Sequence, residues 1–152
     1  MTSFDLERFR GIVASAEFHK FLALELVEGD ADKGYVLLKL AYHPKYSIFP
    51  EPGTYHGGIL ASLIDVAGAL ACGLKAGRPA PTVNLRIDFL QPPAKVDLYA
   101  SGDLRRFGRN LAVADVEIRD AEGNVYCIGR GTFSTAGAFK AIADGAPSAK
   151  EG

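Results

Sequence analysis

Residues 56–76 read HGGILASLIDVAGALACGLKA and carry one long helical pattern. Their apolar side chains recur every three to four positions, which is the spacing of one helix face. Gly77, Pro79 and Pro81 then end the pattern. We therefore predict a single helix over 57–76 whose apolar stripe lies on a sheet. The stripe comprises Ile59, Leu60, Leu63, Ile64, Val66, Ala67, Leu70, Ala71 and Leu74.

The opposite face of this helix carries small residues where a surface helix normally carries Lys, Glu and Arg. Glycine inside a helix costs about 0.5–1 kcal/mol relative to alanine, so Gly58 and Gly68 require a reason. Close packing against a second subunit supplies one. The face comprises Gly58, Ala61, Ser62, Asp65, Gly68, Ala69, Cys72 and Gly73.

Asp65 is the one residue between Gly57 and Leu74 that is charged at neutral pH. A carboxylate that water reaches poorly either finds a partner or has a raised pKa. Two interpretations stay open: a structural carboxylate hydrogen-bonded across an interface, and a catalytic carboxylate in a cleft at that interface.

The start of the helix, His56-Gly57-Gly58, is suited to hold a developing oxyanion. Backbone N–H groups in the first turn lack helical partners, and the helix dipole is positive there. Asp65 lies eight residues beyond Gly57, about 12 Å along the axis. One subunit therefore cannot bring both groups to one carbonyl, whereas two antiparallel helices of a two-fold dimer can.

The rest of the chain predicts one helix near the N-terminus and six strands. The helix contains Leu6, Phe9, Ile12 and Val13, with Ser3 or Asp5 as its cap. Strands are expected at about 21–28, 35–40, 83–89, 95–106, 111–119 and 125–134, with Pro52-Gly53 as a type II turn in an irregular segment. This order predicts an α+β fold in one domain, 1–136, followed by a frayed tail, 137–152.

Composition excludes several classes of protein. The 152 residues are 48% hydrophobic and 23% charged, with a net charge of −1. That balance argues against disorder, nucleic-acid binding and an anionic membrane surface. We see no uninterrupted apolar run of about 20 residues and no signal peptide, and we expect a cytoplasmic protein. Cys72 and Cys127 are expected to be buried free thiols, and no metal-ligand spacing appears.

Several motifs together resemble the hotdog-fold acyl-CoA thioesterases, most of all the phenylacetate-degradation-type (PaaI-like) branch of the 4-hydroxybenzoyl-CoA thioesterase superfamily. One is His56-Gly57-Gly58 with Asp65 nine residues after the histidine. The others are TVNLRIDFLQP over 82–92, RFGR over 106–109 and GRGTF over 129–133. The resemblance covers about 21–135, nearly the whole domain.

The resemblance implies a curved antiparallel sheet wrapped around one long central helix. It also implies homodimers that pair sheets edge to edge, commonly as tetramers, with acyl-CoA bound between subunits. The implied reaction is hydrolysis of a thioester to a free acid and CoA. Coenzyme A is then part of the substrate, and no metal or redox cofactor is expected.

Four residues match the family's catalytic positions. Asp65 matches the carboxylate that activates water or attacks the carbonyl, and Gly57 matches the oxyanion donor. His56 matches a buttress of that loop, although capping the helix explains it nearly as well. Thr82 matches a hydroxyl that orients water, although it also suits a strand start.

One position departs from the family. Related enzymes often carry Asn or Gln six residues before the histidine, where this chain has Pro50 followed by Glu51. Either Glu51 substitutes, or the loop over 50–53 arranges the site differently.

Substrate contacts are expected at both ends of an acyl-CoA. Gly58 lies beside the oxyanion donor, and Tyr55, with Tyr46 and Phe49, precedes the helix and suits an apolar acyl pocket. Guanidinium groups suit the phosphates of CoA. The candidates are Arg105, Arg106 and Arg109 around one hairpin turn.

Two other functions stay open beside a thioesterase. One is a non-catalytic acyl-CoA-binding protein, which usually needs an output domain that this chain has no length for. The other is a hotdog hydratase or dehydratase, which resembles its relatives in using a histidine and an acid on one carbon. Here His56 is tied to the helix start, away from Asp65.

Overall fold

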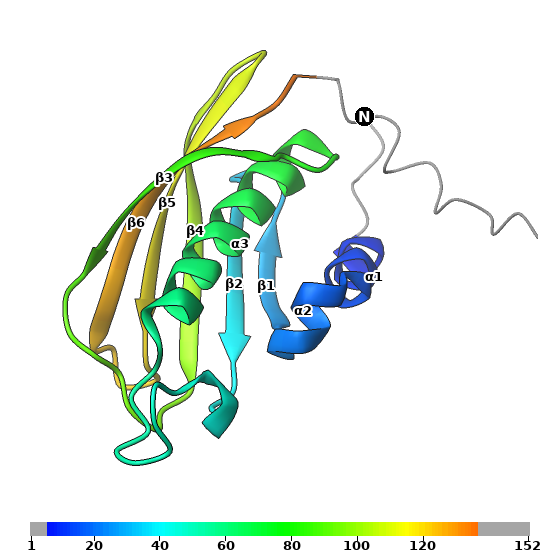
Figure 1. Ribbon diagram of the computed structural model, residues 1–152. Coiled ribbons are helices and arrows are strands. Elements are labelled where there is room, and N and C mark those ends of the chain that lie inside the picture. The colour runs from blue at the N-terminus through cyan, green and yellow to red at the C-terminus, as the bar shows by residue number, and fades with distance from the viewer. Residues whose placement is uncertain (1–5, 137–152) are drawn as a thin grey trace, which may run out of the picture.

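The computed structural model describes residues 6–136, and the expected cap at Ser3 or Asp5 and the tail over 137–152 lie outside them. Six antiparallel strands form one sheet in the order β1-β2-β4-β5-β6-β3. The strands are β1 (Glu25–Asp30), β2 (Tyr35–Leu40), β3 (Thr82–Phe89), β4 (Leu98–Phe107), β5 (Leu111–Arg119) and β6 (Val125–Ser134). The sheet curves around helix α3 (Gly57–Ala76), which confirms the predicted α+β architecture (Figure 1).

Helix α3 lies very close to the sheet. A Cβ added to Gly102 of β4 would overlap the carbonyl oxygen of Ala67, so only glycine fits there. Leu63, Ile64 and Leu74 are buried by this contact, as the apolar stripe predicts. By length and composition α3 is also apolar enough to cross a membrane, contrary to the expectation that the chain has no apolar run of that length. Here it is the core helix of a domain, and more than half of it is buried.

Less of the predicted small-residue face of α3 is exposed than expected. Gly68, Cys72 and Gly73 are buried within the chain itself, so assigning them to a subunit contact was wrong. A Cβ on Gly68 would lie 2.5 Å from Cζ of Phe133, a fully buried residue of β6. Because the sheet curves around the helix, it covers more of the circumference than a flat sheet would. Gly58, Ala61, Ser62, Asp65 and Ala69 are the part of that face left partly exposed.

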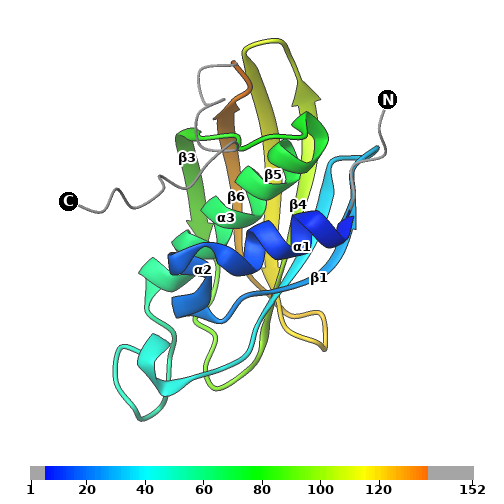
Figure 2. The same ribbon diagram turned by 90° about the vertical axis from the view of Figure 1, so that its right-hand side faces the viewer.

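Two helices precede the sheet where one was predicted. Helices α1 (Leu6–Ser15) and α2 (Glu17–Leu22) lie beside α3 on the β1 side of the sheet (Figure 2). Phe9, Val13 and Leu22 join the same core as α3. The strand expected from residue 21 therefore starts later, at Glu25, after Ala23 ends α2 in the left-handed conformation.

The irregular segment between β2 and α3 holds one short helix, η1 (Pro44–Tyr46). Gly53 has φ +78°, as the predicted turn requires. The strand expected from residue 95 begins at Leu98, and the strands over β5 and β6 match their predicted bounds. The hydroxyl of the buried Tyr46 donates to the carbonyl of Leu22 at 2.6 Å, which ties this segment to α2.

The two edges of the sheet differ. Along β1, the Arg10 guanidinium donates to the carbonyls of Leu26 and Val27, and a bulge interrupts the ladder. Along β3 only one side is paired, and Val83 and Phe89 are 56% and 55% exposed. An unpaired strand edge with exposed apolar side chains is a template for another strand.

We predict that Gly68→Ala destabilises the protein by about 1–3 kcal/mol, because the new methyl group overpacks the contact with Phe133. Gly11→Ala is the matched control, since Gly11 lies in α1 with nothing within 4 Å of an added Cβ. There the gain in helix propensity stabilises by about 0.5–1 kcal/mol. Urea unfolding measures both, and equal effects of the two variants would refute the close contact.

Candidate active site

The amide at the start of α3 is open. His56 is the N-cap, and its Nδ1 accepts a hydrogen bond from the Gly58 N–H at 2.9 Å. The Gly58 N–H is therefore engaged in the cap. Within residues 6–136, no hydrogen bond engages the N–H of Gly57. The structure thus leaves one amide donor of the first turn available to a ligand.

The carboxylate of α3 has a partner in its own chain. The Thr82 hydroxyl donates to Oδ1 of Asp65 at 2.5 Å, because β3 begins beside the middle of the helix. Both side chains are at least partly exposed. The hydrogen bond fixes one carboxylate oxygen, and within the described residues Oδ2 makes no hydrogen bond. This arrangement is suited to accept a proton from water or to attack a carbonyl carbon.

The open amide and the carboxylate lie apart on one helix. Gly57 is the first residue of α3 and Asp65 its ninth, which separates them by about 12 Å along the axis. A single chain thus supplies the two groups at different places, as the sequence predicts.

A cavity of about 290 Å³ opens beside Gly57. A Cβ placed on Gly57 would lie 3.5 Å from Cε1 of Phe89, so the aromatic ring stands next to the helix start. The predicted Tyr55 does line this cavity, whereas Tyr46 and Phe49 do not. Ile48, Phe89 and Leu90 line it without having been predicted, because a loop and a strand end meet only in the folded chain. Its largely apolar walls are formed by Ile48, Tyr55, Leu60, Phe89, Leu90 and Pro92.

Glu51 lies in the exposed loop before α3. Its carboxylate pairs with Nζ of Lys95 at 2.6 Å, and it contacts neither Gly57 nor Asp65 by any hydrogen bond or ion pair. Pro50 is exposed beside it.

The arginines of the β4–β5 hairpin divide into two kinds. Arg105 donates to Asp115 at 2.9 Å on the sheet. Arg106 and Arg109 are exposed, and their side chains make no hydrogen bond or ion pair within residues 6–136. The Thr135 hydroxyl donates to the carbonyl of Gly108 at 2.7 Å, and the preceding Ser134 N–H donates to Pro81 at 2.7 Å. These contacts place the hairpin at the same end of the sheet as the start of β3.

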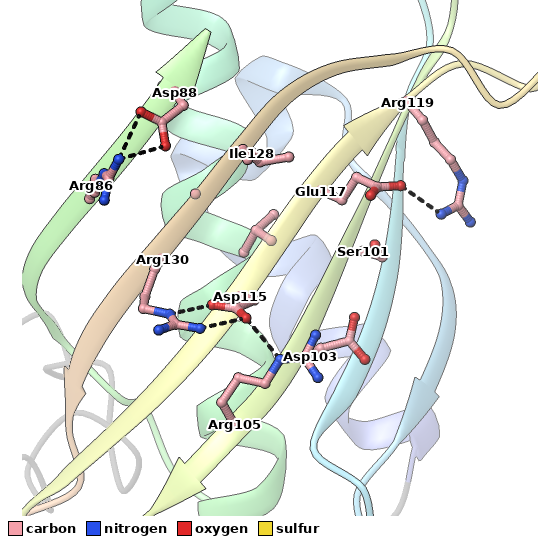
Figure 3. A pocket seen from close by; sticks show the side chains of 12 residues that line it. Arg86, Asp88, Ser101, Asp103, Arg105, Asp115, Glu117, Arg119, Ile128 and Arg130 are labelled. Atoms are coloured by element: carbon pink, nitrogen blue, oxygen red, sulfur yellow. Dashed lines mark hydrogen bonds and ion pairs between the residues drawn. The ribbon is translucent and has the colours of Figure 1, made fainter. Parts of the chain in front are cut away.

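A larger hollow, of about 550 Å³, lies on the sheet face away from α3 (Figure 3). Its arginines are matched by carboxylates, and Asp115 bridges Arg105 and Arg130. The pKa of the Asp115 carboxyl is lowered, mainly because Arg130 donates a hydrogen bond to it. Neither Gly57 nor Asp65 lines this hollow, so we do not assign the active site to it although it is larger than the cavity beside Gly57.

The cysteines fit the predicted structural role. Both are buried, and burial raises the pKa of Cys72 to about 12 and that of Cys127 to about 11. Neither is therefore a thiolate near neutral pH. Within residues 6–136, no group of three or more His, Cys, Asp or Glu side chains is placed to hold a metal ion.

The chain is similar in sequence and in fold to known thioesterases. The family model described as "Thioesterase superfamily" matches residues 52–127. A provisionally named esterase of Halobacterium salinarum is 34% identical over 88% of this chain and 96% of its own length. Medium/long-chain acyl-CoA thioesterase YigI of Escherichia coli is 34% identical over 44% of this chain and 53% of its own.

A solved structure shows the same architecture. The PaaI protein from the phenylacetic acid degradation operon of Escherichia coli superposes with a TM-score of 0.76 at 25% identity. The match covers 85% of this chain and 91% of that protein. The likeness therefore extends over most of this chain.

We predict that His56→Ala lowers the free energy of unfolding by about 1 kcal/mol, because the Gly58 N–H loses its cap. His56→Asn restores most of the loss, since asparagine caps helices well. Urea denaturation of the three proteins measures this. If the alanine variant were as stable as the wild type, the cap would contribute nothing.

Proposed function

We propose, from the premise that this chain belongs to the thioesterase superfamily, that it hydrolyses the thioester of an acyl-CoA to a free acid and CoA. The observation that carries the proposal is the Thr82–Asp65 hydrogen bond beside the partly exposed face of α3. This hydrogen bond orients the Asp65 carboxylate, whose Oδ2 makes no hydrogen bond within residues 6–136. The N–H of Gly57, at the start of the same helix, is likewise without a partner in that range.

The proposed site forms between two copies of the chain. In a two-fold dimer with antiparallel α3 helices, the partner subunit's Gly57 faces Asp65, and two equivalent sites result. The unpaired edge of β3, with exposed Val83 and Phe89, supports edge-to-edge pairing of the sheets. The small side chains that stay partly exposed on α3, such as Ala61, would let the partner approach closely. Such dimers would pair further into tetramers.

The chemistry follows from this placement. Asp65 takes a proton from water, and the resulting hydroxide attacks the thioester carbonyl carbon. The developing oxyanion is held by the partner subunit's Gly57 N–H. The C–S bond then breaks, and the CoA thiolate recovers the proton from Asp65.

A second route differs in its first step. Asp65 attacks the carbonyl carbon itself and CoA leaves as the thiolate. Water then hydrolyses the mixed anhydride, and the proton that this step releases completes the CoA thiol. A single turnover in ¹⁸O-labelled water identifies this second route when the label appears in Asp65. General-base catalysis puts the label in the released acid, whereas attack of water on the Asp65 carbonyl of the anhydride leaves it in Asp65.

We assign the binding of the CoA phosphates to Arg106 and Arg109. Their guanidinium groups lack partners within the described residues and lie at the same end of the sheet as Thr82. Glu51 is paired with Lys95, so the proposal gives it no part in orienting water. His56 is engaged at the helix start, which disfavours the hydratase reading. The reaction uses groups of the chain and water, with CoA entering as part of the substrate.

We predict that Asp65→Asn lowers turnover at least about hundredfold, because the amide neither accepts a proton nor attacks a carbonyl. Asp32→Asn, in the exposed turn before β2, removes the same charge elsewhere and should leave turnover unchanged. Thiol release from aryl, short, medium and long acyl-CoAs measures both. Full activity of Asp65→Asn would remove the residue from the mechanism. No release by the wild type, with acyl-CoA still bound, would identify a binding protein.

We predict that Ala61→Arg disrupts the dimer, because the long side chain occupies the space needed by the partner helix. Ala14→Arg is the matched control on the exposed face of α1. Sedimentation velocity should show a smaller species for Ala61→Arg alone. An intact dimer would refute the close approach of the two α3 helices.

A further inference from the structure

The cavity beside Gly57 presents mainly carbon to its interior. The polar side chains that line it are those of Thr54, Tyr55 and Gln91, and the Tyr55 hydroxyl already donates to the Val96 carbonyl at 2.8 Å. The Gln91 amide donates one of its two hydrogens to the Val125 carbonyl at 2.7 Å. Among the residues that the structure describes, no charged side chain lines the cavity. A carboxylate or ammonium group placed there would lose water and gain no partner of opposite charge, which is unfavourable.

The cavity has a closed side and an open side. Leu60 is only 3% exposed and forms the wall toward the core. Ile48 and Leu90 are 51% and 55% exposed and form the rim. An acyl group whose carbonyl lies at a Gly57 N–H would thus run past Phe89 between these walls.

The volume limits what fits. A cavity of about 150 Å³ holds one benzene molecule. At about 290 Å³ the cavity has room for roughly twice that, or about a dozen carbon atoms. The cavity is too small to hold the CoA moiety in addition to such an acyl group.

We infer that this cavity selects uncharged, apolar acyl groups and buries up to about a dozen of their carbon atoms, and that Ile48 at its rim determines specificity against acyl groups with a charged far end. The inference rests on the proposed function and adds its substrate class. Each methylene buried raises the specificity constant about fourfold. Activity therefore rises with chain length until the cavity is filled and then levels off.

The experiment compares octanoyl-CoA with the eight-carbon acyl-CoA that ends in a carboxylate. We expect wild-type kcat/KM to favour octanoyl-CoA by at least about tenfold. Ile48→Lys should lower the constant for octanoyl-CoA and raise that for the carboxylated substrate, each about tenfold, because the ammonium group pairs with the carboxylate. Leu90→Lys, on the same rim, provides a second variant should Ile48→Lys fold poorly.

Ile12→Lys is the matched control. Ile12 is 50% exposed, as Ile48 is, but it lies on α1 and does not line the cavity. It should leave the preference unchanged. Equal wild-type rates with both substrates, or an unchanged ratio in folded Ile48→Lys and Leu90→Lys, would overturn the inference.

Failure of the proposed function is distinguishable from failure of this inference. If the wild type hydrolyses no acyl-CoA, the proposed function fails. Calorimetry with unreactive thioether analogues of the same two substrates then tests the cavity alone. A wild-type preference for the octanoyl analogue that Ile48→Lys reverses would support the cavity assignment, and equal binding of the two would refute it.

Discussion

The contact between the Ala67 carbonyl and Gly102 sets how deeply α3 lies in the sheet, and the rest of the structure depends on that depth. Because the helix is so close, the Phe133 ring packs against Gly68, and Val116 also lies next to Gly68. The buried stripe then leaves one narrow face of the helix near the surface. Asp65 lies on that face, and the start of β3 passes close enough for Thr82 to reach it. The position of the carboxylate thus follows from backbone packing.

The long helix and most strands were predictable because their periodicity is a local property of the chain. The face of α3 was predicted only in part. A helical wheel gives the direction of each side chain but not how far a curved sheet extends around the helix, so Gly68 and Cys72 were assigned to the wrong surroundings. The second N-terminal helix was missed because Phe21 looked like the beginning of a strand, whereas it is a half-exposed helical residue.

The candidate site shows the same division. Gly57 and Asp65 were found from the sequence because both lie on one helix at a fixed spacing. Thr82 was found only through a family resemblance, since its contact joins residues 17 positions apart. The rim formed by Ile48 and Leu90 was not found, because two separate segments of the chain create it. Local patterns locate groups along an element, while cavities depend on how elements meet.

The unequal edges of the sheet have a consequence for how large an assembly can grow. Strand pairing can add a neighbour only where backbone groups are free, and the Arg10 guanidinium occupies carbonyls of β1. Within the described residues, the proposed pairing edge of each chain is thus β3. Two chains joined there by a two-fold axis consume both such edges, and the outer borders of the joined sheet are then β1 strands. In the proposed dimer, growth by this route would therefore terminate itself, and an occupied β1 edge would keep the chain from forming fibres.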